Sequence, residues 1–157
     1  MHSQPDTSIS RGFTLIELLL VLVILGTLSV YALPRWEPAD TTVAAQADRL
    51  ARDLRHAQAL AMNQGRSLIF DIQPPSAYRV TDSTSTTVTD PADQQAFAVT
   101  LDNNVTVGGS DTGFDSLGRP VSGGALLAAD RSFTLNGNST TATVTLSAVT
   151  GFVAIAP

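Results

Sequence analysis

Hydrophobic and polar positions divide the chain into stretches with different patterns. Residues 1–12 are polar. An almost wholly apolar stretch follows from Phe13 to Leu33, in which Glu17 is the one charged residue. A helix that crosses a hydrocarbon core about 30 Å thick needs roughly 20 residues, and this stretch is long enough. The pattern therefore predicts an apolar N-terminal helix of membrane-spanning length.

The next stretch has the pattern of an amphipathic helix. Pro34 and Pro38 predict a kink or break, because proline lacks an amide hydrogen and clashes with the preceding turn. Asp40 and the two threonines after it offer N-cap oxygens, and Gly65 is a typical C-terminal stop. The spacing predicts a helix that reaches about Asn63. Its narrow apolar face consists of Val43, Ala47, Leu50, Leu54, Ala57 and Ala61.

From Ser67 onward, alternation and turn residues replace the helical spacing. Leu68, Phe70 and Ile72 alternate with more polar positions, and a strand with Tyr78 and Val80 follows a proline turn, which predicts a hairpin. Thr81–Gln95 is a polar loop. Further strands are expected at Ala96–Leu101, Val105–Val107, Ser132–Leu135, Ala142–Ser147 and Gly151–Ile155. One long helix followed by short strands with Gly, Asn and Asp turns predicts the α+β class, with an antiparallel sheet.

Composition narrows the choice of partners. The 157 residues are 43% hydrophobic but only 6% aromatic, so aliphatic and small side chains fill the core. A net charge of −5 gives the chain no overall attraction to nucleic acid, which is therefore not expected as a partner. The absence of cysteine removes disulfides, thiolate metal sites and cysteine nucleophiles.

The residues from Gly12 to Glu17, Gly-Phe-Thr-Leu-Ile-Glu, resemble the recognition sequence of prepilin peptidase. The resemblance implies cleavage between Gly12 and Phe13, N-methylation of the new Phe13 amine, and a role for Glu17 in filament assembly. A physical argument also singles out Glu17. An ionisable side chain within an apolar span costs about 2.5–3.5 kcal/mol on insertion scales and therefore needs a partner.

Other interpretations of the N-terminus stay open. A cleaved secretory signal would have a shorter apolar run and a small-residue cleavage site after it. A plain uncleaved anchor, with Glu17 simply near the membrane surface, is the second alternative. Asp6 and Arg11 cancel in the leader, and Arg35 lies beyond the far end of the span. The positive-inside rule therefore does not determine how the helix is oriented in the membrane, and the orientation follows from the resemblance alone.

Two segments in the C-terminal half extend the resemblance to the GspH/FimT family of minor pilins. They are Phe114–Pro120, with the sequence Phe-Asp-Ser-Leu-Gly-Arg-Pro, and Thr150–Val153, with the sequence Thr-Gly-Phe-Val. The resemblance implies a leader (1–12), a hydrophobic and amphipathic helix spine (13–64) and a β-rich globular domain (65–157). It also implies a single-pass protein of the bacterial inner membrane, anchored by residues 13–33, with its C-terminal domain in the periplasm before filament assembly.

The expected function is structural rather than enzymatic, with prepilin peptidase and other pilins or pseudopilins as partners. We favour a GspH-like minor pseudopilin of a type II secretion pseudopilus. The alternative is a FimT-like minor pilin of a type IV pilus, including mannose-sensitive haemagglutinin-type pili, acting in biogenesis, adhesion or DNA uptake. A DNA receptor would call for arginine or lysine near the C-terminal motif, and residues 150–157 contain neither.

Few residues suggest a catalytic or metal-binding site, and no cofactor is expected. The sequence has no nucleophile elbow, zinc-protease motif or P-loop, and His56 is the one histidine that cleavage would leave. Asp102, Asp111 and Asp115 could supply oxygen ligands to calcium, but they lack the dense alternation of an EF-hand loop, and turn formation is the preferred explanation. The arginines near His56 are interleaved with aspartates at i,i+4 spacing, which favours a salt-bridged, solvated helix face over a nucleic-acid patch.

Overall fold

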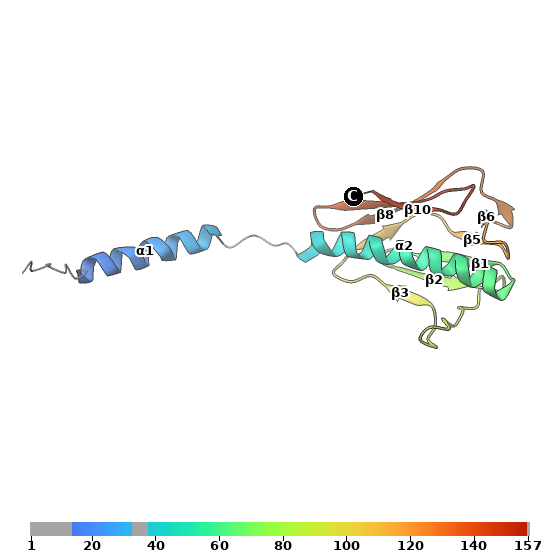
Figure 1. The fold of residues 1–157 in the computed structure, drawn as a ribbon, viewed down its shortest axis with the longest axis horizontal. Helices are drawn as coiled ribbons and strands as arrows, with labels where there is room; N and C mark the ends of the chain where they lie inside the picture. The colour runs from blue at the N-terminus through green and yellow to red at the C-terminus, as the bar shows by residue number, and fades with distance from the viewer. Residues whose placement is uncertain (1–13, 33–37, 157) are drawn as a thin grey trace, which may run out of the picture. The chain divides into compact units, whose positions relative to one another are not determined.

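The computed structural model describes residues 14–32 and 38–156. The chain forms two compact units, Met1–Trp36 and Glu37–Pro157. The first contains helix α1, Leu15–Ala32, and the second, called the body below, contains helix α2, Pro38–Gln64, and all ten strands (Figure 1). The predicted leader lies outside the described residues, and the predicted division into leader, spine and β-rich domain stays a prediction.

Helix α2 has the apolar face that the spacing predicted. All six stripe residues are at least 98% buried. The predicted N-cap at Asp40 is wrong, because the helix already begins at Pro38. Proline is favoured in the first turn, where its missing N–H would have no helical partner. The stop at Gly65 is confirmed: its φ is +62°, and the Arg66 N–H donates to the Ala61 carbonyl at 3.3 Å, as in a Schellman motif.

The strands form two antiparallel sheets. The first has the order β3-β2-β1-β5-β6-β7 and the second the order β10-β9-β8-β4. The bounds in the first sheet are β1 Leu68–Gln73, β2 Ala77–Thr81, β3 Ala98–Thr100, β5 Thr112–Phe114, β6 Pro120–Ser122 and β7 Ala125–Leu126. Those in the second are β4 Thr106–Gly108, β8 Arg131–Asn136, β9 Thr141–Leu146 and β10 Val153–Ala156.

The predicted hairpin is confirmed as β1 and β2, which pair through Phe70 and Val80. The five other predicted strands correspond to β3, β4, β8, β9 and β10. Sequence analysis missed β5, β6 and β7 because they have only two or three residues each and lie among glycines and Pro120. It also expected a single sheet, whereas the strands divide into two.

The core lies between α2 and both sheets. Helix α2 contacts β1 and β5 of the first sheet and β8, β9 and β10 of the second. Phe70 stacks on Tyr78 with ring centroids 4.9 Å apart, and Phe133 of the second sheet meets Phe70 edge-on at 6.2 Å. The buried Tyr78 hydroxyl donates to the Asp53 carboxylate at 2.7 Å. Burial raises the pKa of Asp53 despite that hydrogen bond.

A long loop, residues 82–97, connects β2 to β3 and projects from the body (Figure 1). The Asp82 carboxylate accepts hydrogen bonds from the Thr84 and Thr86 amides at one end of the loop. Further along, the Asp90 carboxylate lies 3.0 Å from His56 Nε2 of α2. Residues 91–95 are exposed beyond this attachment.

Candidate functional site

The first candidate site is the start of α1. The Glu17 amide donates to the Thr14 side-chain oxygen at 3.3 Å and to the Thr14 carbonyl at 3.1 Å. A threonine three residues before a glutamate is the sequence pattern of a capping box. The Glu17 side chain is exposed in the first helical turn. Gly12 and Phe13 lie outside the described residues, so the cleavage, methylation and assembly roles of these three residues remain predictions.

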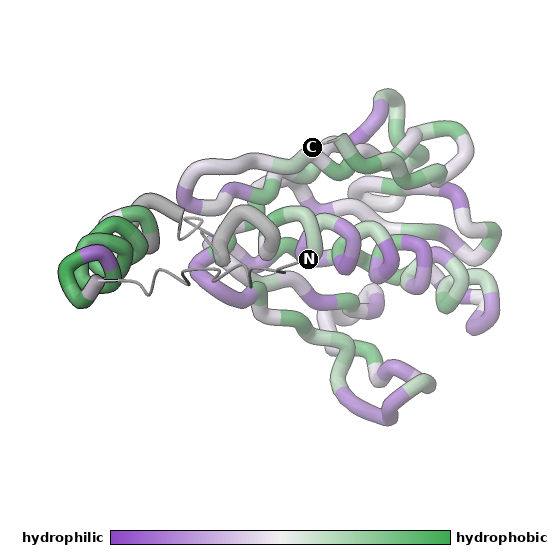
Figure 2. The backbone as a smooth tube through the Cα atoms, turned by 60° about the vertical axis from the view of Figure 1, so that its left-hand side comes forward, coloured by the Kyte–Doolittle hydropathy of each residue, from purple (hydrophilic) through white to green (hydrophobic). Residues whose placement is uncertain are grey.

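Helix α1 presents apolar side chains in every direction. Figure 2 shows its hydrophobic residues all round the helix, in contrast to the mixed pattern of α2. Large apolar side chains are exposed at Leu15, Ile16, Leu18, Leu19, Leu20, Val21, Leu22, Val23, Ile24, Leu25 and Leu28. A helix that is apolar all round is stable when other protein or lipid covers it.

Among residues 14–32 and 38–156, no helix combines the length and hydropathy of a membrane-spanning segment.

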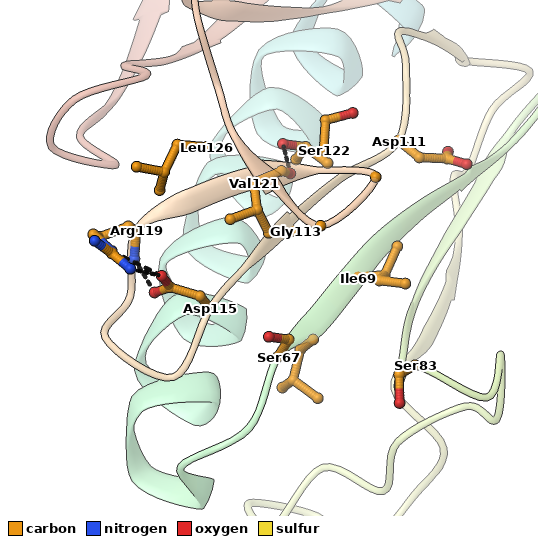
Figure 3. Close-up of a pocket in the computed structure, with 14 residues that line it drawn as sticks. Ser67, Ile69, Ser83, Asp111, Gly113, Asp115, Arg119, Val121, Ser122 and Leu126 are labelled. Atoms are coloured by element: carbon orange, nitrogen blue, oxygen red, sulfur yellow. Dashed lines mark hydrogen bonds and ion pairs between the residues drawn. The ribbon is translucent and has the colours of Figure 1, made fainter.

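The second candidate site is a pocket of about 460 Å³ on the first sheet (Figure 3). Its floor is a row of cross-strand neighbours: Ile69 pairs with Gly113, Gly113 with Val121, and Val121 with Leu126. A Cβ on Gly113 would lie 2.5 Å from the Leu68 carbonyl oxygen. Glycine is therefore required there, because the backbone of β1 already occupies the position of a side chain.

Two of the three charged groups at this pocket, Arg119 and Asp115, pair with each other, and the third, Asp111, accepts a hydrogen bond from the Ile72 amide at 3.0 Å. Arg119 contacts the Asp115 carboxylate through Nε at 2.8 Å and Nη2 at 2.7 Å (Figure 3). Although desolvation acts to raise it, hydrogen bonds from Arg119 and from the Leu117 amide hold the pKa of Asp115 below its usual range. An apolar floor beside a closed ion pair suits contact with an apolar side chain rather than acid–base chemistry.

The three candidate calcium ligands have separate partners. Asp102 accepts from the Gln46 side-chain amide at 3.3 Å, Asp111 accepts from the Ile72 amide at 3.0 Å, and Asp115 pairs with Arg119. Within the described ranges, no group of three or more His, Asp or Glu side chains is placed to hold a metal ion. The structure therefore does not bring these aspartates together.

Polar side chains on α2 form contacts within the helix and with other parts of the body. Arg49 lies 4.0 Å from Asp53, the predicted i,i+4 partner, and Arg55 donates to the Val153 carbonyl at 2.8 Å. The His56 ring packs against Phe97, with centroids 5.5 Å apart. Arg55 therefore fastens α2 to β10 and His56 fastens it to the loop, which is a structural role.

Comparison with known proteins bears on the N-terminal site and on the fold. Residues 8–33 match the family model of the prokaryotic N-terminal methylation motif. Two crystal structures of the type IV minor pilin FimU from Pseudomonas aeruginosa PAO1 are similar to the chain. One has a TM-score of 0.54 and 16% identity, and covers 73% of this chain and 92% of FimU. The other has a TM-score of 0.55 and 15% identity, with 75% and 90% covered.

The chain has the fold of a minor pilin. The predicted α+β, pilin-like architecture is confirmed, and the N-terminal motif supports the predicted resemblance to minor pilins and pseudopilins. No curated protein matches the chain.

Sequence analysis missed one junction of this pilin-type body. The Gln58 side-chain amide of α2 donates to the Gly118 carbonyl at 2.8 Å, in the turn between β5 and β6. A Cβ on Gly151, in the turn between β9 and β10, would lie 2.3 Å from Gln58 Nε2. The two segments that carried the family resemblance therefore meet at one helix residue. Nothing in the sequence around Gln58 predicted these contacts, because the helical pattern identifies it only as a polar residue outside the apolar face.

Proposed function

We propose that the chain is a minor subunit of a pilin-type filament, cleaved between Gly12 and Phe13 and methylated at the Phe13 amine. One observation carries the proposal: a matched methylation motif leads directly into an apolar helix in a chain with a minor-pilin fold. Prepilin peptidase and other pilin-type subunits are the partners that this assignment requires.

Glu17 supplies the assembly chemistry. Cleavage creates a positively charged amine at Phe13, about one helical turn before Glu17. When apolar N-terminal helices pack together, a carboxylate without a partner is costly, whereas one that pairs with the amine of a neighbouring subunit is not. The pairing would fix the axial position of each subunit relative to the next.

Before assembly, residues 13–33 would hold the subunit in the bacterial inner membrane with the body in the periplasm. This location follows from the apolar stretch and from the proposed processing. On extraction, the apolar surface of α1 would exchange lipid for the helices of other subunits, which accounts for its exposure on every side.

The first test is intact mass and N-terminal sequencing of the protein from its native membrane. A chain that starts at methylated Phe13 supports the proposal. A chain that starts at Met1 in cells with active prepilin peptidase overturns it. A Gly12→Glu variant is the matched control, because it should keep the leader while leaving the body folded.

Two filament systems use such a subunit. A type II secretion pseudopilus is the candidate that sequence analysis favours. A type IV pilus is the second, and the likeness of the fold to FimU favours it. Deletion of the gene separates them: loss of exoprotein secretion with piliation intact assigns the pseudopilus, whereas loss of pili with secretion intact assigns the pilus.

A further inference from the structure

We propose that His56 and Asp90 form a pH-sensitive switch, which holds the tip of the long loop against α2 in mildly acidic solution and releases it as the pH rises toward 8. The tip consists of residues 90–95. This inference goes beyond the proposed function, because it concerns the body alone and holds whether or not the chain enters a filament.

The tip closes on itself at the end of a short two-stranded ribbon. Thr89 and Ala96 form an antiparallel bridge, and the Asp90 amide donates to the Gln95 carbonyl at 2.8 Å. The Gln94 amide in turn donates to the Asp90 carbonyl, also at 2.8 Å. Hydrogen bonds within the tip therefore maintain its shape, and its position against α2 depends on contacts with that helix.

His56 makes two contacts that join the loop to α2. Its Nε2 lies 3.0 Å from Asp90 Oδ1, an oxygen that also accepts a hydrogen bond from the Ala92 amide at 2.8 Å. Its ring packs against Phe97, with centroids 5.5 Å apart. Phe97 is buried and lies just after the tip, so the ring contact anchors the base of the tip. The contact with Asp90 holds the tip itself.

His56 is the side chain in this region that changes its charge near neutral pH. The charged side chains around it and the adjoining cleft are Arg49, Arg52 and Asp53 of α2 and Asp90 and Asp93 of the loop. Arginine stays charged at all these pH values, and aspartate normally ionises near pH 3.9. Hydrogen bonds from the Ala92 amide and from His56 lower the pKa of Asp90, so its carboxylate stays charged. Histidine normally titrates between about pH 5 and 8.

The charge on His56 therefore sets the strength of its contact with Asp90. A protonated imidazole donates to the carboxylate in a charge-assisted hydrogen bond. As the pH rises through the range in which histidine titrates, the positive charge is lost, and a neutral ring forms only an ordinary hydrogen bond with the same oxygen. The side chains are 39% and 18% exposed, so solvent screens the attraction and the change in the population of the released tip is modest.

Release of the tip opens a polar cleft between α2 and the loop. The cleft has a volume of about 240 Å³, and Asp90 and Asp93 of the tip line it together with Arg49 and Asp53 of α2. Asp53 accepts the hydrogen bond of the buried Tyr78 hydroxyl. Opening therefore hydrates Asp53 and presents the exposed residues 91–95 in a different position on the body.

The test measures the distance between the tip and α2 at two pH values. The chain contains no cysteine, so two introduced cysteines can be spin-labelled selectively. They replace Ala92 in the tip and Ala59, an exposed position on α2, in the full-length chain in detergent. We expect one main distance between the labels at pH 5.5, and a second population that increases about threefold at pH 8. The same distance distribution at both pH values overturns the inference.

Three variants identify the groups responsible. His56→Gln retains a hydrogen-bonding side chain that does not titrate, and Asp90→Asn removes the charge of the carboxylate, so each should abolish the dependence on pH. Asp53→Asn is the matched control, because burial raises the pKa of this neighbouring carboxyl, and it should retain the dependence. A dependence that persists in His56→Gln or Asp90→Asn, or that disappears in Asp53→Asn, overturns the assignment.

Discussion

Gly151 illustrates how strongly a single residue is constrained in this body. Its φ of +69° is costly for any side chain, and a Cβ there would also lie 2.3 Å from Gln58 Nε2. We expect Gly151→Ala to lower the free energy of unfolding by more than about 1 kcal/mol, since strain and a displaced glutamine add together. Urea denaturation of the body measures the change.

Gly124→Ala is the matched control for this substitution. Gly124 also has a positive φ, +85°, but nothing lies within 4 Å of its Cβ position. Gly124→Ala should therefore lower the free energy of unfolding only by the cost of placing an alanine at a positive φ. Equal losses in the two variants would mean that Gln58 moves aside freely and does not support the turn.

Carboxylates that cap turns set the response of the body to acid. Hydrogen bonds from Thr84 and Thr86 lower the pKa of Asp82, and hydrogen bonds from the Ala92 amide and from His56 lower that of Asp90. A carboxylate whose pKa is lower in the folded than in the unfolded chain stabilises the fold above its unfolded pKa, near 3.9. That stabilisation is lost as the pH falls through the folded pKa.

Although Asp53, whose pKa burial raises, acts in the opposite direction, we expect these carboxylates to make the body less stable at pH 3 than at pH 5, as measured by thermal unfolding across that range. Asp115, whose pKa is also lowered, contributes in the same direction. Asp115→Asn should reduce the difference between the two pH values, whereas Asp130→Asn serves as a comparison outside these turns. An Asp115→Asn variant with the same difference in stability between the two pH values as the native chain would contradict the role assigned to Asp115.

At the scale of elements, α2 was predictable because its signal is local and repeated. Six apolar positions at intervals of three or four residues fix which face is buried, whatever the helix packs against. Strands β5 to β7 were not predictable from the sequence. Each has only two or three residues, which is barely one period of the alternation between hydrophobic and polar positions. Gly113 and Pro120 also read as turn residues. Strand β5 pairs with β1, more than forty positions earlier in the chain, and Gln58 likewise reaches Gly118 across 60 residues.

The stripe on α2 gives a direct test of its packing. Leu54 is fully buried between the helix and the strands. We expect Leu54→Ala to lower the free energy of unfolding by about 2–5 kcal/mol, the range found when a buried leucine leaves a cavity. Met62→Ala on the same helix should cost much less, because nearly half of that side chain is exposed. Chemical denaturation of both variants checks the contrast, and equal losses would contradict the assignment of the buried face.

At the scale of the molecule, the two units differ in whether they contain a hydrophobic core. Every buried hydrophobic side chain in the described ranges falls between Val43 and Val153, inside the body. We expect a fragment that begins at Glu37 to unfold cooperatively, with the same thermal midpoint as the body of the full-length chain in detergent. A fragment that unfolds without cooperativity would show that the N-terminal unit contributes to the core.

Sequence also defined the N-terminal site more readily than any surface of the body. The residues from Gly12 to Glu17 form one continuous motif beside an abrupt change in hydropathy, so they need no tertiary information to be found. The exposed side chains of the body, such as Leu117 and Phe152, lie on turns that are far apart in the sequence. Leu117 and Phe152 carried the resemblance in the sequence, but their accessibility follows only from the packed turns.

The long loop between β2 and β3 offers a position for a reporter. Its exposed segment, residues 91–95, lies beyond the contact between Asp90 and His56, and it includes none of the buried hydrophobic side chains. Exposed loop tips of this kind tolerate insertions. A short epitope or a fluorophore placed between Ala92 and Asp93 would leave α1 unlabelled. Microscopy of living cells could then follow the subunit from envelope to filament.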